Sequence, residues 1–213
     1  MNYVFPLWLY PRIANDLLDN GPQEKTANLA PDFCAKIRVA ASGEPSAEDA
    51  LGYIYAVLYA PSYRKRYAGF LKRDFPRVPL TTDHKLFVDL VRIGRELIAL
   101  HTMEKTLSRI TRYDVTGSNE VVKVRWAPSV SSAQGRVYIN AEQYFEGVSQ
   151  DVWDTHVGGY RIAERWLKDR KGRKLSYDDL THYQAVVASL ARTLELQGQI
   201  DGAIQTAGGW PLK

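Results

Sequence analysis

Helical spacing of apolar residues is the clearest pattern in the chain. After Asp83, apolar side chains recur every three or four residues, which predicts a helix from Asp83 to about Leu107. The same spacing follows Ser176, which precedes Asp179 by three residues as in a capping box, and it predicts a second long helix to about Ile204. These two helices are the longest elements that we expect.

Shorter helices are expected elsewhere. Ser46 and Asp49 have the spacing of another capping box, and the apolar positions after them predict a helix that stops at Pro61. A further helix begins at Ser62. Residues 32–39, 149–153 and 162–168 also have short helical patterns.

A period of two replaces the helical period in the middle of the chain. Residues 121–126 alternate in the manner of a half-buried strand, and residues 137–139 predict a second strand after a turn at residues 134–135. Residues 3–10 suit a short strand near the N-terminus. A strand pair between helical segments predicts an α+β fold, rich in helix with a small, mostly antiparallel sheet.

Composition places the chain among ordinary globular proteins. Its 213 residues are 45% apolar and 24% charged, which is enough for a core without disulfide or metal cross-links. Cys34 is the single cysteine, so no internal disulfide is expected. The sequence has neither an apolar run of the ~18 to 20 residues that a membrane helix needs nor a secretion signal. We therefore expect a cytoplasmic protein that does not enter the membrane.

Positive charge is concentrated in two segments. Residues 64–77 hold six cations and one carboxylate, and residues 161–174 hold seven cations and two carboxylates, whereas the whole chain carries a net charge of only +4. Because each segment exceeds the charge of the whole chain, both are candidate surfaces for an anionic partner.

Motifs for catalysis are missing from the sequence. We find no phosphate-binding loop, dinucleotide-binding glycine motif, serine nucleophile elbow or paired-histidine zinc motif. Asp74 with Asp83-His84-Lys85 weakly resembles the carboxylates and lysine of metal-dependent nucleases, but we interpret Asp83 as a helix N-cap. No catalytic residue is therefore predicted.

Histidine and cysteine predict no metal site either. The histidines lie far apart in the sequence, at His84, His101, His156 and His182. We place His101 in the core as a hydrogen-bonded residue, because it falls on the apolar face of its helix. Cys34 has no adjacent histidine or lysine, so we expect a buried, unreactive thiol.

Aromatic residues stand beside several cations, as in Tyr160-Arg161 and Arg165-Trp166-Leu167-Lys168. Such pairs suit a polyanion, because the cation neutralises a phosphate while the ring packs on a sugar or base. Gly172, between Lys171 and Arg173, would let the backbone approach a phosphate closely. The alternative is that these residues form an ordinary solvated surface.

Several longer strings resemble one known family. The first are Tyr53-Ile54-Tyr55-Ala56-Val57-Leu58, Pro61-Ser62-Tyr63-Arg64 and Asp74-Phe75-Pro76-Arg77-Val78-Pro79-Leu80. The later ones are Gln143-Tyr144-Phe145-Glu146-Gly147-Val148, His156-Val157-Gly158-Gly159-Tyr160, Trp166-Leu167-Lys168-Asp169-Arg170-Lys171-Gly172-Arg173 and His182-Tyr183-Gln184. In this order, over roughly residues 3–200, they resemble the C-terminal specificity region of type ISP restriction-modification enzymes.

In that family one polypeptide joins a nuclease, a helicase-like ATP-driven translocase, an adenine-N6 methyltransferase and a C-terminal target recognition domain. The resemblance covers only the last part. It implies a sequence-specific recognition domain for double-stranded DNA that positions a target adenine for a methyltransferase domain of the same or a companion polypeptide. It also implies no enzymatic activity and no cofactor in this chain, since S-adenosylmethionine, ATP and Mg²⁺ would belong to the parent enzyme.

The resemblance suggests a division of the chain. Residues 1–45 would form a strand and loops that join to the methyltransferase domain, residues 46–205 the target recognition domain, and residues 206–213 a tail.

DNA contacts are expected from the strand pair and from the C-terminal basic segment. The candidates are Lys123, Arg125, Arg136, Tyr160, Arg161, Lys168, Arg170, Lys171 and Arg173. A separate set, Lys72, Arg73 and Arg77, is a candidate interface with the methyltransferase domain, because the nearby prolines make a rigid extended arm.

Two other functions remain open on the sequence. The chain would be a protein-interaction scaffold, docking a methyltransferase or helicase without reading DNA, if its basic residues were scattered around an exposed apolar patch. It would be a non-specific single-strand binder if exposed aromatic residues stacked on successive bases.

Overall fold

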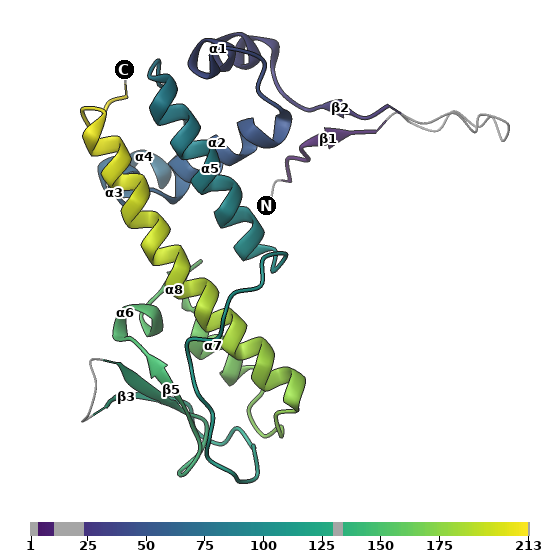
Figure 1. Cartoon of the computed structure of the whole chain (residues 1–213), viewed down its shortest axis with the longest axis vertical. Helices are drawn as coiled ribbons and strands as arrows, with labels where there is room; N and C mark the ends of the chain where they lie inside the picture. The colour runs from purple at the N-terminus through teal and green to yellow at the C-terminus, as the bar shows by residue number, and fades with distance from the viewer. Residues whose placement is uncertain (1–3, 11–23, 130–133, 213) are drawn as a thin grey trace, which may run out of the picture. The chain divides into compact units, whose positions relative to one another are not determined.

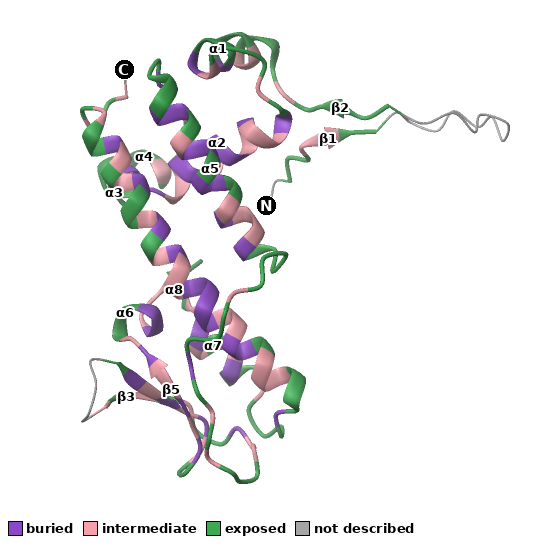
Figure 2. Cartoon of the chain, in the orientation of Figure 1, coloured by how far each residue is buried: buried purple, intermediate pink, exposed green. Residues whose placement is uncertain are grey.

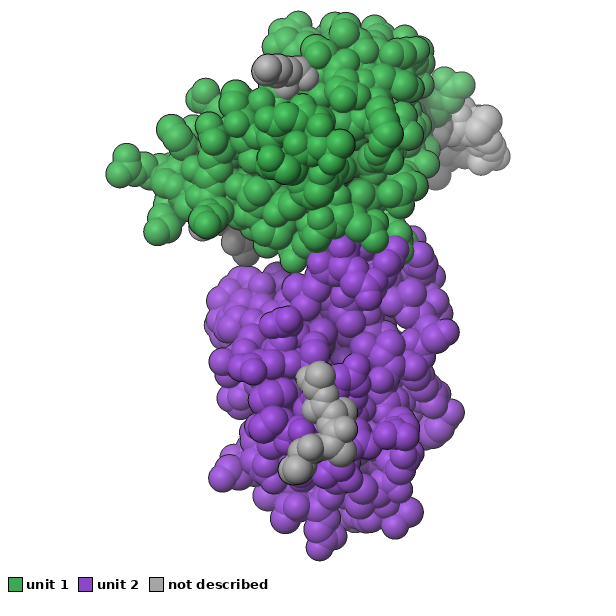
Figure 3. All heavy atoms as spheres, turned by 60° about the vertical axis from the view of Figure 1, so that its left-hand side comes forward, with its two compact units in different colours: residues 1–99, 197–213 green, residues 100–196 purple. Residues whose placement is uncertain are grey.

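The computed structural model describes residues 4–10, 24–129 and 134–212, so Tyr3 of the expected N-terminal strand and Lys213 of the expected tail lie outside the described residues. The chain forms two compact units, residues 1–99 with 197–213 and residues 100–196, which are coloured separately in Figure 3. No helix within the described ranges is long and apolar enough to cross a membrane.

The first unit is built almost entirely from helices (Figure 1). A two-residue pair of strands, β1 (Trp8–Leu9) and β2 (Thr26–Ala27), precedes them. The helices are α1 (Pro31–Ala41), α2 (Ala47–Tyr59), α3 (Pro61–Arg66), α4 (Ala68–Leu71), α5 (His84–His101) and the last turns of α8 (Tyr177–Thr206).

Capping residues begin α2 and α5 where the sequence predicts. Ser46 and Asp49 form a reciprocal capping box on α2, with both backbone-to-side-chain distances at 3.1 Å. Asp83 Oδ1 accepts from the Leu86 amide at 3.1 Å, so its role as an N-cap is confirmed.

Two glycines set the approach of α2 to α5. A Cβ placed on Gly94 would collide with the backbone carbonyl of Gly52, and one placed on Gly52 would lie 3.0 Å from the carbonyl oxygen of Val91. The two helices therefore pack backbone to backbone at this crossing, which only glycine allows.

The C-terminal tail packs on the first unit. The Trp210 ring lies 5.5 Å from Tyr63 and 6.1 Å from Tyr67, centroid to centroid. Its Nε1 donates to Ser62 Oγ at 2.7 Å, and the Ser62 amide donates to Asp201 of α8. The tail thus ties the end of α8 to the start of α3.

The second unit combines a three-stranded antiparallel sheet with helices (Figure 1). The strand order is β3 (Arg125–Pro128), β4 (Gly135–Tyr138) and β5 (Tyr144–Val148). It is followed by α6 (Gln150–Trp153), a hairpin of β6 (His156–Val157) and β7 (Tyr160–Arg161), α7 (Ile162–Lys168) and most of α8. The expected α+β class with a small antiparallel sheet is confirmed.

A core of apolar residues joins the sheet to α6, α7 and α8, as the buried colours of Figure 2 indicate. At its centre the Phe145 ring packs 4.6 Å from Tyr113 and 4.5 Å from Tyr183, and Tyr183 in turn packs 5.3 Å from Trp166. Trp126 covers Gly135, where a Cβ would collide with the indole ring, and its Nε1 donates to the Val148 carbonyl at 3.0 Å.

Some local predictions need correction. Strand pairing begins at Arg125 rather than residue 121, because the amides of Val122 and Lys123 both donate to the Ile139 carbonyl and the ladder is irregular there. The sequence reading also missed β5. Helix α5 ends at His101 rather than Leu107, since Met103 takes a left-handed conformation with a φ of 59°.

The predicted burial of two single residues is also wrong. His101 is hydrogen-bonded as expected, since its Nε2 lies 2.9 Å from Thr193 Oγ1, but the residue is exposed rather than part of the core. It is the last residue of α5. Cys34 is half-buried rather than part of the core.

Candidate nucleic-acid interface

The outward face of the three-stranded sheet carries arginine and tyrosine side chains in two rows. Register places Arg125 beside Tyr138, which is beside Tyr144, and places Arg136 between Ala127 and Glu146. Side chains alternate across a strand, and the intervening Val137 and Phe145 are fully buried. The two rows therefore face away from the core.

Each arginine of the sheet lies over a tyrosine of the neighbouring strand. The Arg125 guanidinium is 3.6 Å from the Tyr138 ring centroid, and that of Arg136 is 4.5 Å from the Tyr144 centroid. Such contacts contribute about 0.5–1 kcal/mol at exposed sites and restrict the side-chain rotamers. The sheet therefore presents arginines in defined positions.

Glu146 holds two arginines. Its Oε1 accepts from Arg136 Nε at 3.0 Å and Nη2 at 2.8 Å, while its Oε2 accepts from Arg112 Nη2 at 3.0 Å. Hydrogen bonds from Arg136 and the positive charge of both guanidinium groups lower the pKa of Glu146. One carboxylate fixes two cations, so a positive charge remains in this row.

Arg109 extends the basic surface, and the sequence reading missed it. Its Nη2 lies 3.4 Å from the Tyr177 hydroxyl and 3.3 Å from Thr181 Oγ1, which lowers the pKa of Tyr177. With Arg112 and Asp114 it lines a pocket of about 330 Å³. Arg109 and Arg112 lie outside both basic segments, so the charge pattern did not mark them.

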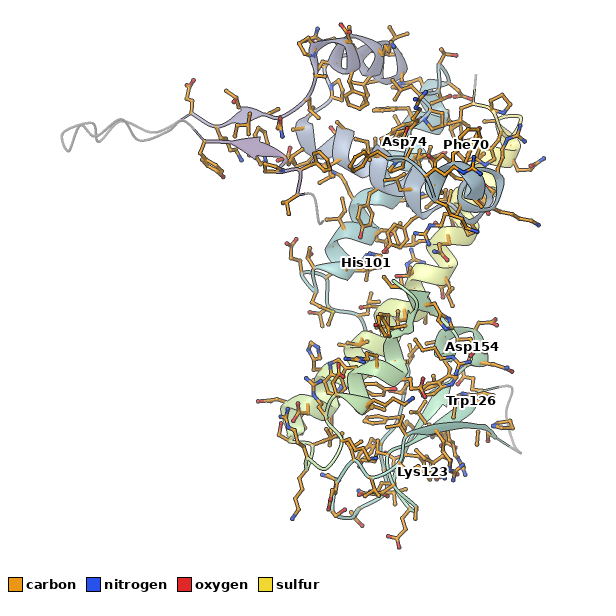
Figure 4. All side chains as sticks on the ribbon, turned by 180° about the vertical axis from the view of Figure 1, so that it is seen from behind. Phe70, Asp74, His101, Lys123, Trp126 and Asp154 are labelled. Carbon is orange, nitrogen blue, oxygen red and sulfur yellow. The ribbon has the colours of Figure 1, made fainter. Side chains whose placement is uncertain are left out.

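A basic turn lies beside the segment that leads into β3. The Val121 amide donates to the Arg173 carbonyl at 3.0 Å, and the Gly172 amide donates to the Val121 carbonyl at 2.8 Å. Gly172 has a φ of +78°, a conformation that favours glycine. These bonds bring Lys171 and Arg173 next to the segment that carries Lys123 and leads into β3 at Arg125; Figure 4 labels Lys123 on this segment and Trp126 on β3.

Four of the predicted cations lack a carboxylate partner. Within residues 4–10, 24–129 and 134–212, no carboxylate oxygen lies within 4 Å of the side-chain nitrogens of Lys123, Arg125, Lys171 or Arg173. All four side chains are exposed. They form the group of predicted residues that is free to neutralise phosphates, and we call it the open cation group.

The remaining predicted cations are paired with carboxylates. Arg136 is held by Glu146, Arg161 lies 3.1 Å from Asp154, and Lys168 lies 2.8 Å from Glu164. Arg170 reaches Asp179 at 3.4 Å and lies 3.5 Å from the Trp166 centroid. A phosphate would have to displace a carboxylate at each of these positions. The number of cations in segment 161–174 therefore overstates how many of them are available to bind phosphates.

Tyr160 lies at the tip of the β6–β7 hairpin. The two turn residues, Gly158 and Gly159, have φ values of 59° and 86°, as a tight two-residue hairpin turn requires. The Tyr160 side chain is 60% exposed, with the Arg165 guanidinium 5.3 Å from its ring centroid. This ring is available for packing against a sugar or base.

The residues predicted to form an interface with a methyltransferase domain belong to the first unit. Lys72, Arg73 and Arg77 are exposed on the segment that follows α4, and Arg77 Nη2 lies 3.9 Å from Asp74 Oδ2.

The described residues contain no group of three or more His, Cys, Asp or Glu side chains arranged to hold a metal ion.

Three solved structures are similar in fold. The ATP-dependent type ISP restriction-modification enzyme LlaBIII bound to DNA matches 92% of this chain at 21% identity and a TM-score of 0.68. A DrdV–DNA complex matches 91% of this chain at 20% identity and a TM-score of 0.69. A nuclease-deletion mutant of the type ISP enzyme LlaGI in complex with a DNA substrate mimic matches 74% of this chain at 23% identity and a TM-score of 0.55. The present chain spans only 13%, 21% and 14% of those three chains, respectively.

Comparison with curated proteins gives no match. A family model described as the type ISP C-terminal specificity domain matches residues 1–198, nearly the whole chain. The residue strings that suggested this family are therefore supported by a match along the same stretch. The chain belongs to the family of type ISP C-terminal specificity domains.

Proposed function

We propose that this chain recognises a specific double-stranded DNA sequence and so positions a target adenine for a methyltransferase domain. The observation that carries the proposal is the open cation group, which stands beside a sheet face of ordered arginines in a member of a specificity-domain family. The similar structures, by their titles, contain DNA, which agrees with this role.

The two parts of the surface have different tasks. Lys123, Lys171 and Arg173 neutralise phosphates and fix the register of the domain on the duplex, which requires charge but no hydrogen-bond code. Arg125 and Arg136 read base edges, because a guanidinium held in a fixed orientation donates two hydrogen bonds to guanine in the major groove. Tyr160 packs against a sugar at the edge of the contact.

The chemistry belongs to other parts of the enzyme. In this proposal S-adenosylmethionine, ATP and Mg²⁺ act in the methyltransferase, translocase and nuclease parts, and this chain supplies the recognition step. A specificity-domain family indicates a recognition domain.

A selection experiment tests the proposal. The purified chain is titrated with a random duplex pool at two salt concentrations, and the bound fraction is sequenced. We expect salt-sensitive binding and enrichment of one asymmetric motif. No binding at low salt would contradict recognition by this chain alone and favour the scaffold function.

Paired variants locate the surface. Lys171→Ala with Arg173→Ala removes two open cations, and we expect at least about a tenfold loss of duplex affinity at low salt. Arg165→Ala with Lys168→Ala is the matched control, because Arg165 is paired with Asp169 and Lys168 with Glu164. Equal losses in both double variants would show that the distinction between open and paired cations is wrong.

A further inference from the structure

A pocket of about 560 Å³ opens in the helical unit, and none of its lining residues is among those proposed to contact DNA. It is walled by α3, α4 and the extended segment 74–79, with Tyr63, Tyr67, Phe70, Phe75 and Pro79 among its lining residues. Phe70 and Asp74, at its rim, are labelled in Figure 4. The proposed DNA contacts do not use this pocket.

Two large aromatic side chains of the pocket are exposed. Phe70 is 75% exposed and Phe75 is 56% exposed, although both are apolar. One wall already receives an aromatic ring, because Phe5 packs edge-on against Phe75 with centroids 5.9 Å apart. Exposed aromatic residues around a hollow are typical of a protein-binding surface.

The pocket is preformed by hydrogen bonds behind its wall. The Tyr63 hydroxyl donates to the Arg77 carbonyl at 2.7 Å, and the Tyr53 hydroxyl donates to the Pro79 carbonyl at 2.8 Å. These bonds fix the segment 74–79 against the helices and engage the hydroxyl donors of Tyr63 and Tyr53. An apolar side chain fits such a wall better than a nucleic-acid base, whose polar edges would find few partners.

The charge of the segment that forms the pocket defines the kind of partner. Arg77 and Asp74 line the pocket, and Asp74 is the only carboxylate between residues 64 and 77. Asp74 is itself engaged by the Phe75 amide and by Arg77. The exposed cations that neighbour the lining residues in sequence are Lys65, Arg66, Lys72 and Arg73. An apolar hollow in a basic segment is complementary to an apolar side chain flanked by carboxylates.

We propose that this pocket binds an acidic protein segment that inserts one aromatic or large aliphatic side chain between Phe70 and Phe75. The inserted side chain buries the two exposed rings, and the Asp and Glu residues beside it contact Lys72 and Arg73. The site gives the candidate interface residues a role that is independent of DNA.

Peptide selection tests the pocket directly. A displayed library of random short peptides is selected on the purified chain, with counter-selection on the Phe70→Ser variant. We expect enrichment of peptides with one Trp, Phe or Leu flanked by Asp and Glu. Failure to enrich such peptides would overturn the proposal.

Variants then assign the contacts by fluorescence anisotropy with a synthetic peptide of the enriched sequence. Phe70→Ser should weaken binding by at least about tenfold, because a buried aromatic contact is lost. Lys72→Glu with Arg73→Glu should weaken it more at low salt than at high salt. The matched controls, Val88→Ser on α5 and Lys36→Glu on α1, change an exposed apolar residue and an exposed cation of the same unit and should bind normally.

Duplex binding by the same variants separates this proposal from the proposed function. Unchanged duplex affinity of Phe70→Ser supports a separate protein-binding pocket, whether or not the chain proves sequence-specific. If Phe70→Ser abolished duplex binding, the pocket would belong to the nucleic-acid surface and the proposal would be wrong.

Discussion

The hydroxyl groups of two buried tyrosines differ in what they contact. Tyr183, in the core of the second unit, is fully buried, and its hydroxyl has no hydrogen-bond partner among the described residues. Tyr53, in the first unit, donates to the Pro79 carbonyl and accepts from the Thr81 amide at 3.1 Å. Burial raises the pKa of both hydroxyls, so both stay neutral at physiological pH.

Removing the two hydroxyls should therefore change the free energy of unfolding in opposite directions. Tyr183→Phe deletes an unsatisfied polar atom and should raise the free energy of unfolding by about 1 kcal/mol. Tyr53→Phe leaves a buried carbonyl and amide without a partner and should lower it by about 1–3 kcal/mol. Thermal unfolding followed by circular dichroism measures both. Destabilisation by Tyr183→Phe would mean that its hydroxyl binds a water molecule.

At the scale of elements, helices were predicted better than strands. A capping pair fixes the start of a helix locally. The two predicted pairs, Ser46 with Asp49 and Ser176 with Asp179, both form as expected. The strand β5 depends instead on β4 and on the Arg112 segment, which lies far away in sequence. Local patterns reveal local hydrogen bonds, and they do not reveal pairing between distant segments.

The crossing of α2 and α5 gives a stability prediction. Gly94→Ala would place a methyl group against the Gly52 backbone, and we expect a loss of about 1–3 kcal/mol or more, since overpacking against backbone has little room to relax. Gly202→Ala on α8 is the matched control. Its added Cβ meets nothing within 4 Å, so it should stabilise the helix by about 0.5–1 kcal/mol.

Denaturant unfolding of the two glycine variants distinguishes helix propensity from packing. Propensity alone would stabilise both variants. A stabilised Gly94→Ala variant would therefore contradict the close crossing.

The sheet face gives a prediction about specificity. Glu146→Gln removes the charge that orients Arg136 and Arg112 while keeping a similar shape. Total duplex affinity should hold or rise, because a negative charge is lost. Preference for the selected motif over an unrelated duplex should fall by roughly tenfold, because Arg136, whose guanidinium we propose reads a base, is no longer held. Competition binding with the two duplexes measures this ratio, and an unchanged ratio would assign Arg136 to packing.

At the scale of the whole molecule, the density of charge overstates the number of cations without a carboxylate partner. The densest basic segment, 161–174, contains several cations that α7 and its neighbours neutralise with carboxylates, as Lys168 with Glu164 shows. Pairing at four residues along a helix is visible in the sequence, whereas the contacts of Arg136 and Arg161 come from other elements. The family was recognised from ordered strings, which depend on neither charge nor pairing.

The salt dependence of duplex binding tests the whole surface at once. Each phosphate neutralised contributes about −0.9 to the slope of log affinity against log salt concentration. If Lys123, Lys171 and Arg173 make the phosphate contacts, the slope should be about −3. If the paired cations Arg161, Lys168 and Arg170 also exchanged their carboxylates for phosphates, it would be nearer to about −5.

The Lys171→Ala, Arg173→Ala double variant tests which cations make the phosphate contacts. It should reduce the magnitude of the slope by about 2, because two contacts are removed, whereas the Arg165→Ala, Lys168→Ala control should leave it unchanged. A slope that stays constant in the first variant and falls in the second would place DNA on α7. The phosphate-binding surface would then have to be reassigned, because carboxylate pairing would not have kept those cations from DNA.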